Sequence, residues 1–154
     1  MLDCKPCSNP CCSSHHLVPA NSPLLTYPTA YRSLVGALQY MTFTRPDLSY
    51  AIQQACQFMS HPTSHHLVAA KRILRYIKGS LHLGIHFQKG SLALSAYSDA
   101  NWAGDPIDRR SIIGMVVFSG NSPITWSAKK QPSLGALQRL NIEHLLLLQL
   151  SSIG

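Results

Sequence analysis

The sequence is short of charged residues, and of acidic residues above all. Charged residues make up only 12% of the 154 residues, about half the share usual in a globular domain. Thirteen lysines and arginines stand against six acids, which gives a formal net charge of +7. Such an excess favours contact with polyanions such as nucleic acid, although a simple scarcity of acids would leave the same basic remainder.

A secretory leader and long apolar runs are lacking as well. The first ten residues contain neither a basic nor an apolar targeting region, and no apolar run is long enough to cross a bilayer. The sequence therefore predicts no membrane partner and a reducing, intracellular location in which the five cysteines are free thiols. Apolar residues make up 45% of the chain, which is enough for a core in one domain or in pieces of two.

The first half of the chain predicts an arm followed by helices. Residues 1–29 are rich in Pro, Ser, Cys and His and predict an extended arm. Residues 30–79 predict three helices, with Thr44 as an N-cap of the second and Gly79 as the stop of the third. These helices are expected over 31–43, about 44–60 and 64–79. The apolar residues expected to face the core are Leu34, Val35, Leu38, Met41, Leu48, Ile52, Ala55, Cys56, Met59, Leu67, Val68, Ile73, Leu74 and Ile77.

After Gly79 the apolar period changes to two, which indicates half-buried strands in residues 80–133. About four strands are expected, over 83–87, 92–99, 112–119 and 124–127, with a turn at 120–121. The expected fold class is therefore α+β, a three-helix segment followed by an antiparallel sheet. Residues 134–154 carry leucine all round a helix and predict a helical tail.

Basic residues gather on the third expected helix, at Lys71, Arg72, Arg75 and Lys78. Lys71, Arg75 and Lys78 share a helix face, so they could follow a phosphate backbone. A solvated basic side of an amphipathic helix explains the same pattern, and the residues alone leave both interpretations open.

The arm contains residue types that zinc binds. A CxxC pair can supply two of the four tetrahedral ligands, but the spacing here matches no common zinc finger. An arm with incidental thiols is therefore the alternative. The residues concerned are Cys4, Cys7, Cys11, Cys12, His15 and His16.

Asp99 stands at the end of an expected strand. A carboxylate there can hold a divalent cation when other acids converge on it, and Asp105 and Asp108 are the only acids near it in sequence. From the residues alone, a turn aspartate is the better interpretation.

Five motifs occur in a specific order and spacing: YRSLVGALQY, TRPDLSYA, KRILRYIKG, SDANWAGD and WSAKKQP. In this order they resemble the Pol polyprotein of copia-type LTR retrotransposons, in particular its plant members, from Met1 to about Ser133. The resemblance implies that residues 30–79 are the C-terminal helices and connection segment of a reverse transcriptase, and that residues 80–133 begin an RNase H-like sheet. It also implies that Asp99 matches the first metal-binding carboxylate of RNase H, and that the basic helix lies near the primer–template duplex.

The resemblance further implies what the chain lacks for the family's activity, RNA-directed DNA polymerisation with ribonuclease H. The polymerase motif Tyr-x-Asp-Asp needs an Asp pair, and no such pair occurs here. The second RNase H acid belongs to a helix directly after WSAKKQP, which this sequence does not show. The codons of residues 134–154 can spell a Ser-Ser-Thr-Ala-Glu-Tyr helix in another frame, so we interpret the tail as frameshifted.

We therefore predict a truncated Pol remnant without catalytic activity of its own. Mg²⁺, the cofactor of the intact family enzyme, is not expected to bind tightly. An RNA–DNA hybrid is expected as a weak partner, and upstream Pol segments are further candidates. The alternatives are a hybrid-binding module and a zinc-binding interaction protein.

Overall fold

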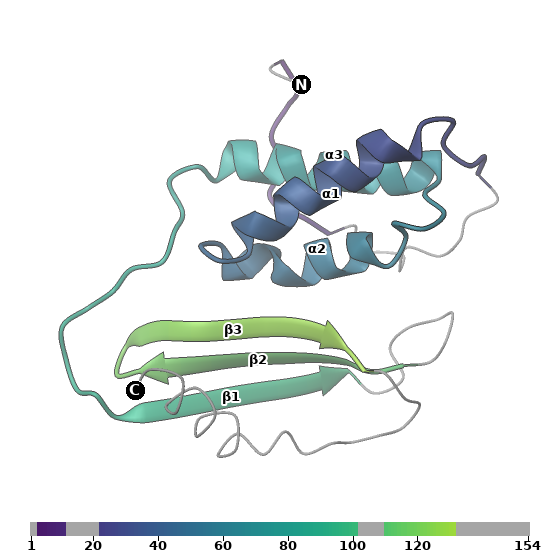
Figure 1. The fold of residues 1–154 in the computed structure, drawn as a ribbon. Helices are drawn as coiled ribbons and strands as arrows, with labels where there is room; N and C mark the ends of the chain where they lie inside the picture. The colour runs from purple at the N-terminus through teal and green to yellow at the C-terminus, as the bar shows by residue number, and fades with distance from the viewer. Residues whose placement is uncertain (1–2, 12–21, 102–109, 132–154) are drawn as a thin grey trace.

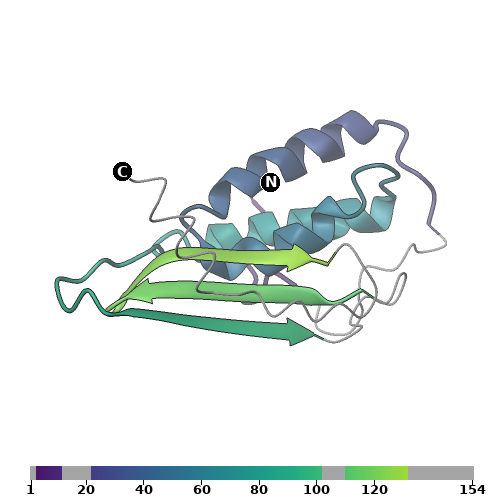
Figure 2. The ribbon, with the colours of Figure 1, turned by 60° about the horizontal axis from the view of Figure 1, so that its bottom comes forward.

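Three helices precede a three-stranded sheet in the computed structural model, which describes residues 3–11, 22–101 and 110–131. The helices form one layer and the sheet another, and β3 is the strand that contacts α2 (Figures 1 and 2). This arrangement confirms the expected α+β class. The elements are α1 (Pro28–Met41), the 3-10 turn η1 (Pro46–Leu48), α2 (Ser49–Cys56), α3 (Ser64–Gly79), β1 (Leu94–Asn101), β2 (Ile112–Ser119) and β3 (Ser122–Lys130).

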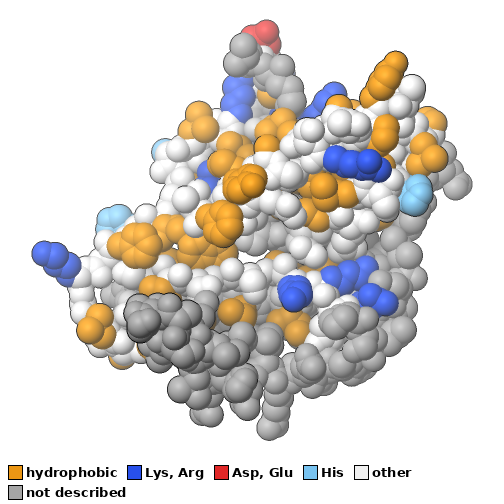
Figure 3. Space-filling model, viewed as in Figure 1, with side chains coloured by type: hydrophobic (Ala, Val, Ile, Leu, Met, Phe, Trp, Pro, Cys, Tyr) orange, Lys and Arg blue, Asp and Glu red, His pale blue; other side chains and the backbone are white. Residues whose placement is uncertain are grey.

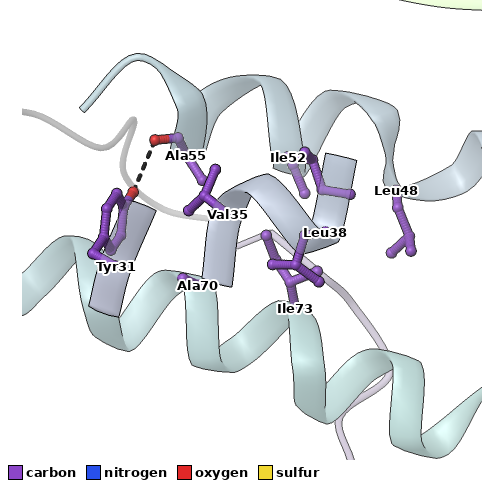
Figure 4. Close-up of a cluster of buried hydrophobic side chains, with 9 residues drawn as sticks. Tyr31, Val35, Leu38, Leu48, Ile52, Ala55, Ala70 and Ile73 are labelled. Carbon is purple, nitrogen blue, oxygen red and sulfur yellow. Dashed lines mark hydrogen bonds between the residues drawn. The ribbon is translucent and has the colours of Figure 1, made fainter. Parts of the chain in front are cut away.

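The apolar faces of α1, α2 and α3 meet in one core (Figure 4). Burial of one Leu, Ile or Val side chain contributes about 1.5–3 kcal/mol, so this cluster is the main source of stability for the helical layer. The Tyr31 hydroxyl is satisfied inside it, because Oη donates to the Ala55 carbonyl oxygen over 2.8 Å. The buried members are Tyr31, Val35, Leu38, Leu48, Ala51, Ile52, Ala55, Ala70 and Ile73.

The sheet is an antiparallel meander in the order β1-β2-β3. The expected strand over 112–119 has the observed bounds of β2, and the turn at 120–121 is also observed. Gly120 lies at φ +55°, and a Cβ there would meet the Ser91 carbonyl oxygen. Both observations require glycine at this position.

Two side chains of β3 connect the layers. Trp126 Nε1 donates to the Thr42 carbonyl oxygen over 2.6 Å, and Lys130 Nζ donates to Gln57 Oε1 over 3.2 Å. The sheet face that carries Trp126 therefore faces the helices.

The start of the second helix differs from the prediction. Arg45, not Thr44, precedes the first turn, and α2 proper runs only from Ser49 to Cys56. The residue before a proline is disfavoured in the helical region, and Arg45 accordingly lies at φ −133°, ψ 78°. Thr44 instead donates its hydroxyl to the Met41 carbonyl oxygen at the end of α1.

The predicted strand over 83–87 was wrong, and the described residues contain three strands. The side chains of Leu83 and Phe87 are 46% and 66% exposed. The alternating apolar side chains of this segment therefore have no apolar surface to pack against, and packing of this kind is what stabilises a strand. Val68 was also placed wrongly, since it is 64% exposed. It lies two residues from both His66 and Ala70, and two residues turn a helix by about 200°, away from the buried face.

Gly79 closes α3 as its last residue, and the C-cap is Ser80. The predicted tail helix, residues 134–154, lies outside the described residues. Among the helices that are described, none has the length and apolar character needed to cross a bilayer.

Candidate nucleic-acid interface and metal carboxylate

The orientation of α3 is set at its first turn. Thr63 and His66 form a capping box, in which the Thr63 hydroxyl accepts from the His66 amide and His66 Nδ1 accepts from the Thr63 amide. His66 is buried and stacks on Phe58 with 3.9 Å between ring centroids. This anchor directs one side of α3 into the core and leaves its basic residues on the other side.

The basic side of α3 contacts the N-terminal segment of the chain, which we call the strap (residues 3–11). Lys71 is exposed, whereas the other three predicted phosphate-binding residues donate hydrogen bonds to strap carbonyl oxygens. These bonds run from Arg72 Nε to Asn9 (3.1 Å), from Arg75 Nε to Lys5 (2.7 Å) and from Lys78 Nζ to Cys4 (3.0 Å). The structure thus brings the four residues together on one helix, as predicted, but adds a neighbour that the sequence pattern did not indicate.

Backbone and thiol contacts hold the strap along α3. Cys7 donates its amide to the Arg75 carbonyl oxygen over 3.3 Å and its thiol to the Arg72 carbonyl oxygen over 3.4 Å. Pro6 lies against Gly79, where an added Cβ would come within 2.9 Å of the Pro6 Cβ. The strap therefore follows α3 as far as its last residue.

The predicted zinc ligands fall only partly within the structure. Cys4, Cys7 and Cys11 are half-buried cysteines of the strap. Among the described residues, no three His, Cys, Asp or Glu side chains gather closely enough to hold a metal ion. Cys12, His15 and His16 lie outside the described residues, so zinc binding stays a prediction.

Asp99 lies on β1 and faces the helical layer. It pairs with Gly114, which pairs with Ala128, and Ala128 is two residues from Trp126 on β3. Directly paired residues share a face of a sheet, as do residues two apart on one strand. Asp99 is therefore on the face whose Trp126 side chain bonds to Thr42.

A pocket of about 470 Å³ opens beside Asp99, between the sheet and the helical layer. Its aromatic lining comes from Tyr50, Tyr97 and Trp126, and an adjoining hollow of about 560 Å³ shares Trp126. Asp105 and Asp108 lie outside the described residues. Mg²⁺ prefers several oxygen ligands in octahedral geometry, so the described lining, with one carboxylate among aromatic rings, does not fit a two-metal centre.

Arg45 forms a polar contact that the sequence patterns considered above did not indicate. Its side chain is almost fully buried and donates to both carboxylate oxygens of Asp47, at 3.0 and 2.8 Å, and to the carbonyl and hydroxyl of Ser80. The hydrogen bond to Asp47 raises the pKa of Arg45, and the same bond lowers the pKa of Asp47. The start of α2 is thereby joined to the end of α3, and the TRPD motif in the sequence is the signal that could have indicated it.

Comparison with known proteins shows which proteins the chain is similar to. It is 51% identical over 132 residues to the retrovirus-related Pol polyprotein from transposon RE1 of Arabidopsis thaliana, and 49% identical over 132 residues to that from transposon RE2. Both matches cover 85% of this chain and 9% of the relative. An uncharacterized mitochondrial protein of Arabidopsis thaliana, AtMg00810, is 45% identical over 139 residues, with 87% of this chain and 56% of the relative covered. No family model and no solved structure matches.

These similarities define the class as retrovirus-related Pol polyproteins of transposons. Within that class, the chain belongs to the Pol polyproteins of copia-type LTR retrotransposons, as the sequence motifs predicted. It spans about a tenth of the length of the RE1 and RE2 polyproteins.

Proposed function

We propose that this segment of Pol does not catalyse nucleic-acid cleavage or synthesis by itself. Asp99 supports the proposal best: it is exposed at a pocket whose described lining holds no second acid. Two-metal phosphodiester chemistry needs several carboxylates that bridge and flank the cations. In this proposal Asp99 corresponds to the first carboxylate of an RNase H-type sheet, of which β1, β2 and β3 are the opening meander.

A nuclease assay tests this proposal. The full chain is incubated with an RNA–DNA hybrid and either Mg²⁺ or Mn²⁺, beside an Asp99→Asn variant. We expect the hybrid to stay intact in both samples. Metal-dependent cleavage by the unaltered chain that disappears in Asp99→Asn would contradict the proposal, whereas cleavage that survives in the variant would indicate a contaminating nuclease.

A second function, weak binding of nucleic acid through α3, is favoured by the position of the basic residues. Lys71, Arg72, Arg75 and Lys78 lie on the side of the helix away from the core, and the chain carries a formal charge of +7. On the face shown in Figure 3, coloured acidic side chains occur at the N-terminal end alone. Phosphate contacts of this kind confer affinity that falls with salt and carries little sequence preference.

Salt-dependent binding tests the second function with matched variants. Lys71→Ala/Lys78→Ala removes two charges from α3, and Lys89→Ala/Lys129→Ala removes two from exposed positions elsewhere. We expect the α3 variant to lower the salt slope of hybrid binding by about 2, since each phosphate contact contributes about one unit. Equal slopes for the two variants would show that net charge, and not α3, determines the binding.

A further inference from the structure

We infer that the strap and nucleic-acid phosphates compete for the same face of α3, so that the form of the protein that binds nucleic acid is the one with the strap displaced. This inference rests on the proposed nucleic-acid contact through α3. It adds a regulating element that lies within the chain itself.

The groups that would bind phosphate are the groups that hold the strap. Arg72, Arg75 and Lys78 each donate to one strap carbonyl oxygen, at distances between 2.7 and 3.1 Å. Only Lys71 stands clear of these bonds as an exposed cation. A phosphate backbone that approached along α3 would therefore meet donors that are already directed toward another acceptor.

The exchange is chemically reasonable because the two acceptors differ in charge. The Arg and Lys donors are cations in both cases, but a peptide carbonyl is neutral whereas a phosphate is an anion, so a phosphate adds an attraction between opposite charges. Side chains on a helix that bond to an extended segment can therefore exchange carbonyls for phosphates without a change in the core. The buried side chains of α3, His66, Ala70 and Ile73, lie on its other side.

Gly79 offers a way to loosen the strap without altering any charge. A Cβ at this position would lie 2.9 Å from the Pro6 Cβ, so Gly79→Ala requires the strap to move. Gly36 is a matched control, because it is also a helical glycine and an added Cβ there meets nothing within 4 Å. Both substitutions add one methyl group to a helix and leave every lysine and arginine in place.

The first experiment compares hybrid affinity at fixed low salt. Gly79→Ala should bind about tenfold more tightly than the unaltered chain, roughly the factor that one lost hydrogen bond contributes. Gly36→Ala should bind as the unaltered chain does. Equal or weaker binding by Gly79→Ala overturns the inference. Absence of binding by every variant would reject the proposed nucleic-acid contact itself, and the inference with it.

The second experiment uses the unaltered chain, so it does not depend on how Gly79→Ala folds. The Cys7 thiol donates to the Arg72 carbonyl oxygen, so its alkylation reports on strap release, while Cys56 in α2 serves as the internal reference. Because coupling between two ligands is reciprocal, hybrid that displaces the strap must raise the alkylation rate of Cys7 relative to Cys56. Site-resolved mass spectrometry measures both rates. An unchanged or slower Cys7 rate at saturating hybrid overturns the inference, even where binding itself is observed.

Discussion

Replacement of Arg45 by leucine should destabilise the protein strongly, because the substitution removes a charge that is fully engaged inside the fold. The guanidinium makes two hydrogen bonds to Asp47 and two to Ser80, and the Arg45 side chain is 5% exposed. Removal of one partner of a buried ion pair costs about 3–5 kcal/mol. The Asp47 side chain is 34% exposed and can regain water, so we expect a loss of about 2–4 kcal/mol.

Urea unfolding followed by far-ultraviolet circular dichroism at neutral pH measures this loss. A slope of about 2 kcal/mol per molar urea, which is ordinary for a small protein, turns the expected loss into a midpoint lower by about 1–2 M. The ordinary stability of a small domain is about 5–15 kcal/mol, so the variant should remain folded in the absence of denaturant.

Arg32 provides the matched control for Arg45. It is an exposed arginine that also donates to carbonyl oxygens, those of Met59 and Ser60, at 2.8 and 3.2 Å. Arg32→Leu should cost no more than about 0.5 kcal/mol, as surface substitutions usually do. If Arg45→Leu and Arg32→Leu shift the midpoint equally, the buried contacts of the Arg45 guanidinium do not stabilise the fold more than exposed ones do.

Three further predictions follow from single contacts. The hydrogen bond from Arg45 lowers the pKa of Asp47 below its ordinary 3.8. Stability that is present at neutral pH should therefore be lost as pH falls through the folded-state pKa of Asp47. In urea titrations at a series of acidic pH values, Asp47→Asn should make this loss of stability smaller. Burial, and then the nearby Cys56, raise the pKa of Tyr31 above its ordinary 10.0. The free energy of unfolding should therefore fall as pH rises beyond 10. If the free energy of unfolding of Tyr31→Phe falls just as steeply, this prediction is wrong. Gly120→Ala should cost about 1–3 kcal/mol in thermal unfolding because of its positive φ and the adjacent Ser91 carbonyl, while Gly84→Ala, with open space around it, should cost little.

Local patterns in the sequence predicted the elements whose determinants lie close together along the chain. The three helices follow from apolar spacing, and β2 and its turn follow from alternation that ends at a glycine. The same local reasoning failed at residues 83–87, where alternation is present but no apolar surface lies opposite. It also failed at Thr44: because Arg45 precedes a proline it stays out of the helical region, so Arg45 and not Thr44 stands before the first turn.

The family can be recognised from the sequence, since five motifs in order are specific without any coordinates, and the sequence also identifies Asp99 and the basic residues of α3 as the candidate site. The surroundings of these residues, in contrast, depend on the tertiary structure. It places Asp99 at a pocket lined by aromatic rings, and it brings the strap onto α3 through bonds such as that from Lys78 to Cys4, across 74 residues. Such contacts depend on the packing of the whole helical layer, and no local periodicity encodes them. The basic face of α3 is therefore readable from sequence, but its engagement by the strap is not.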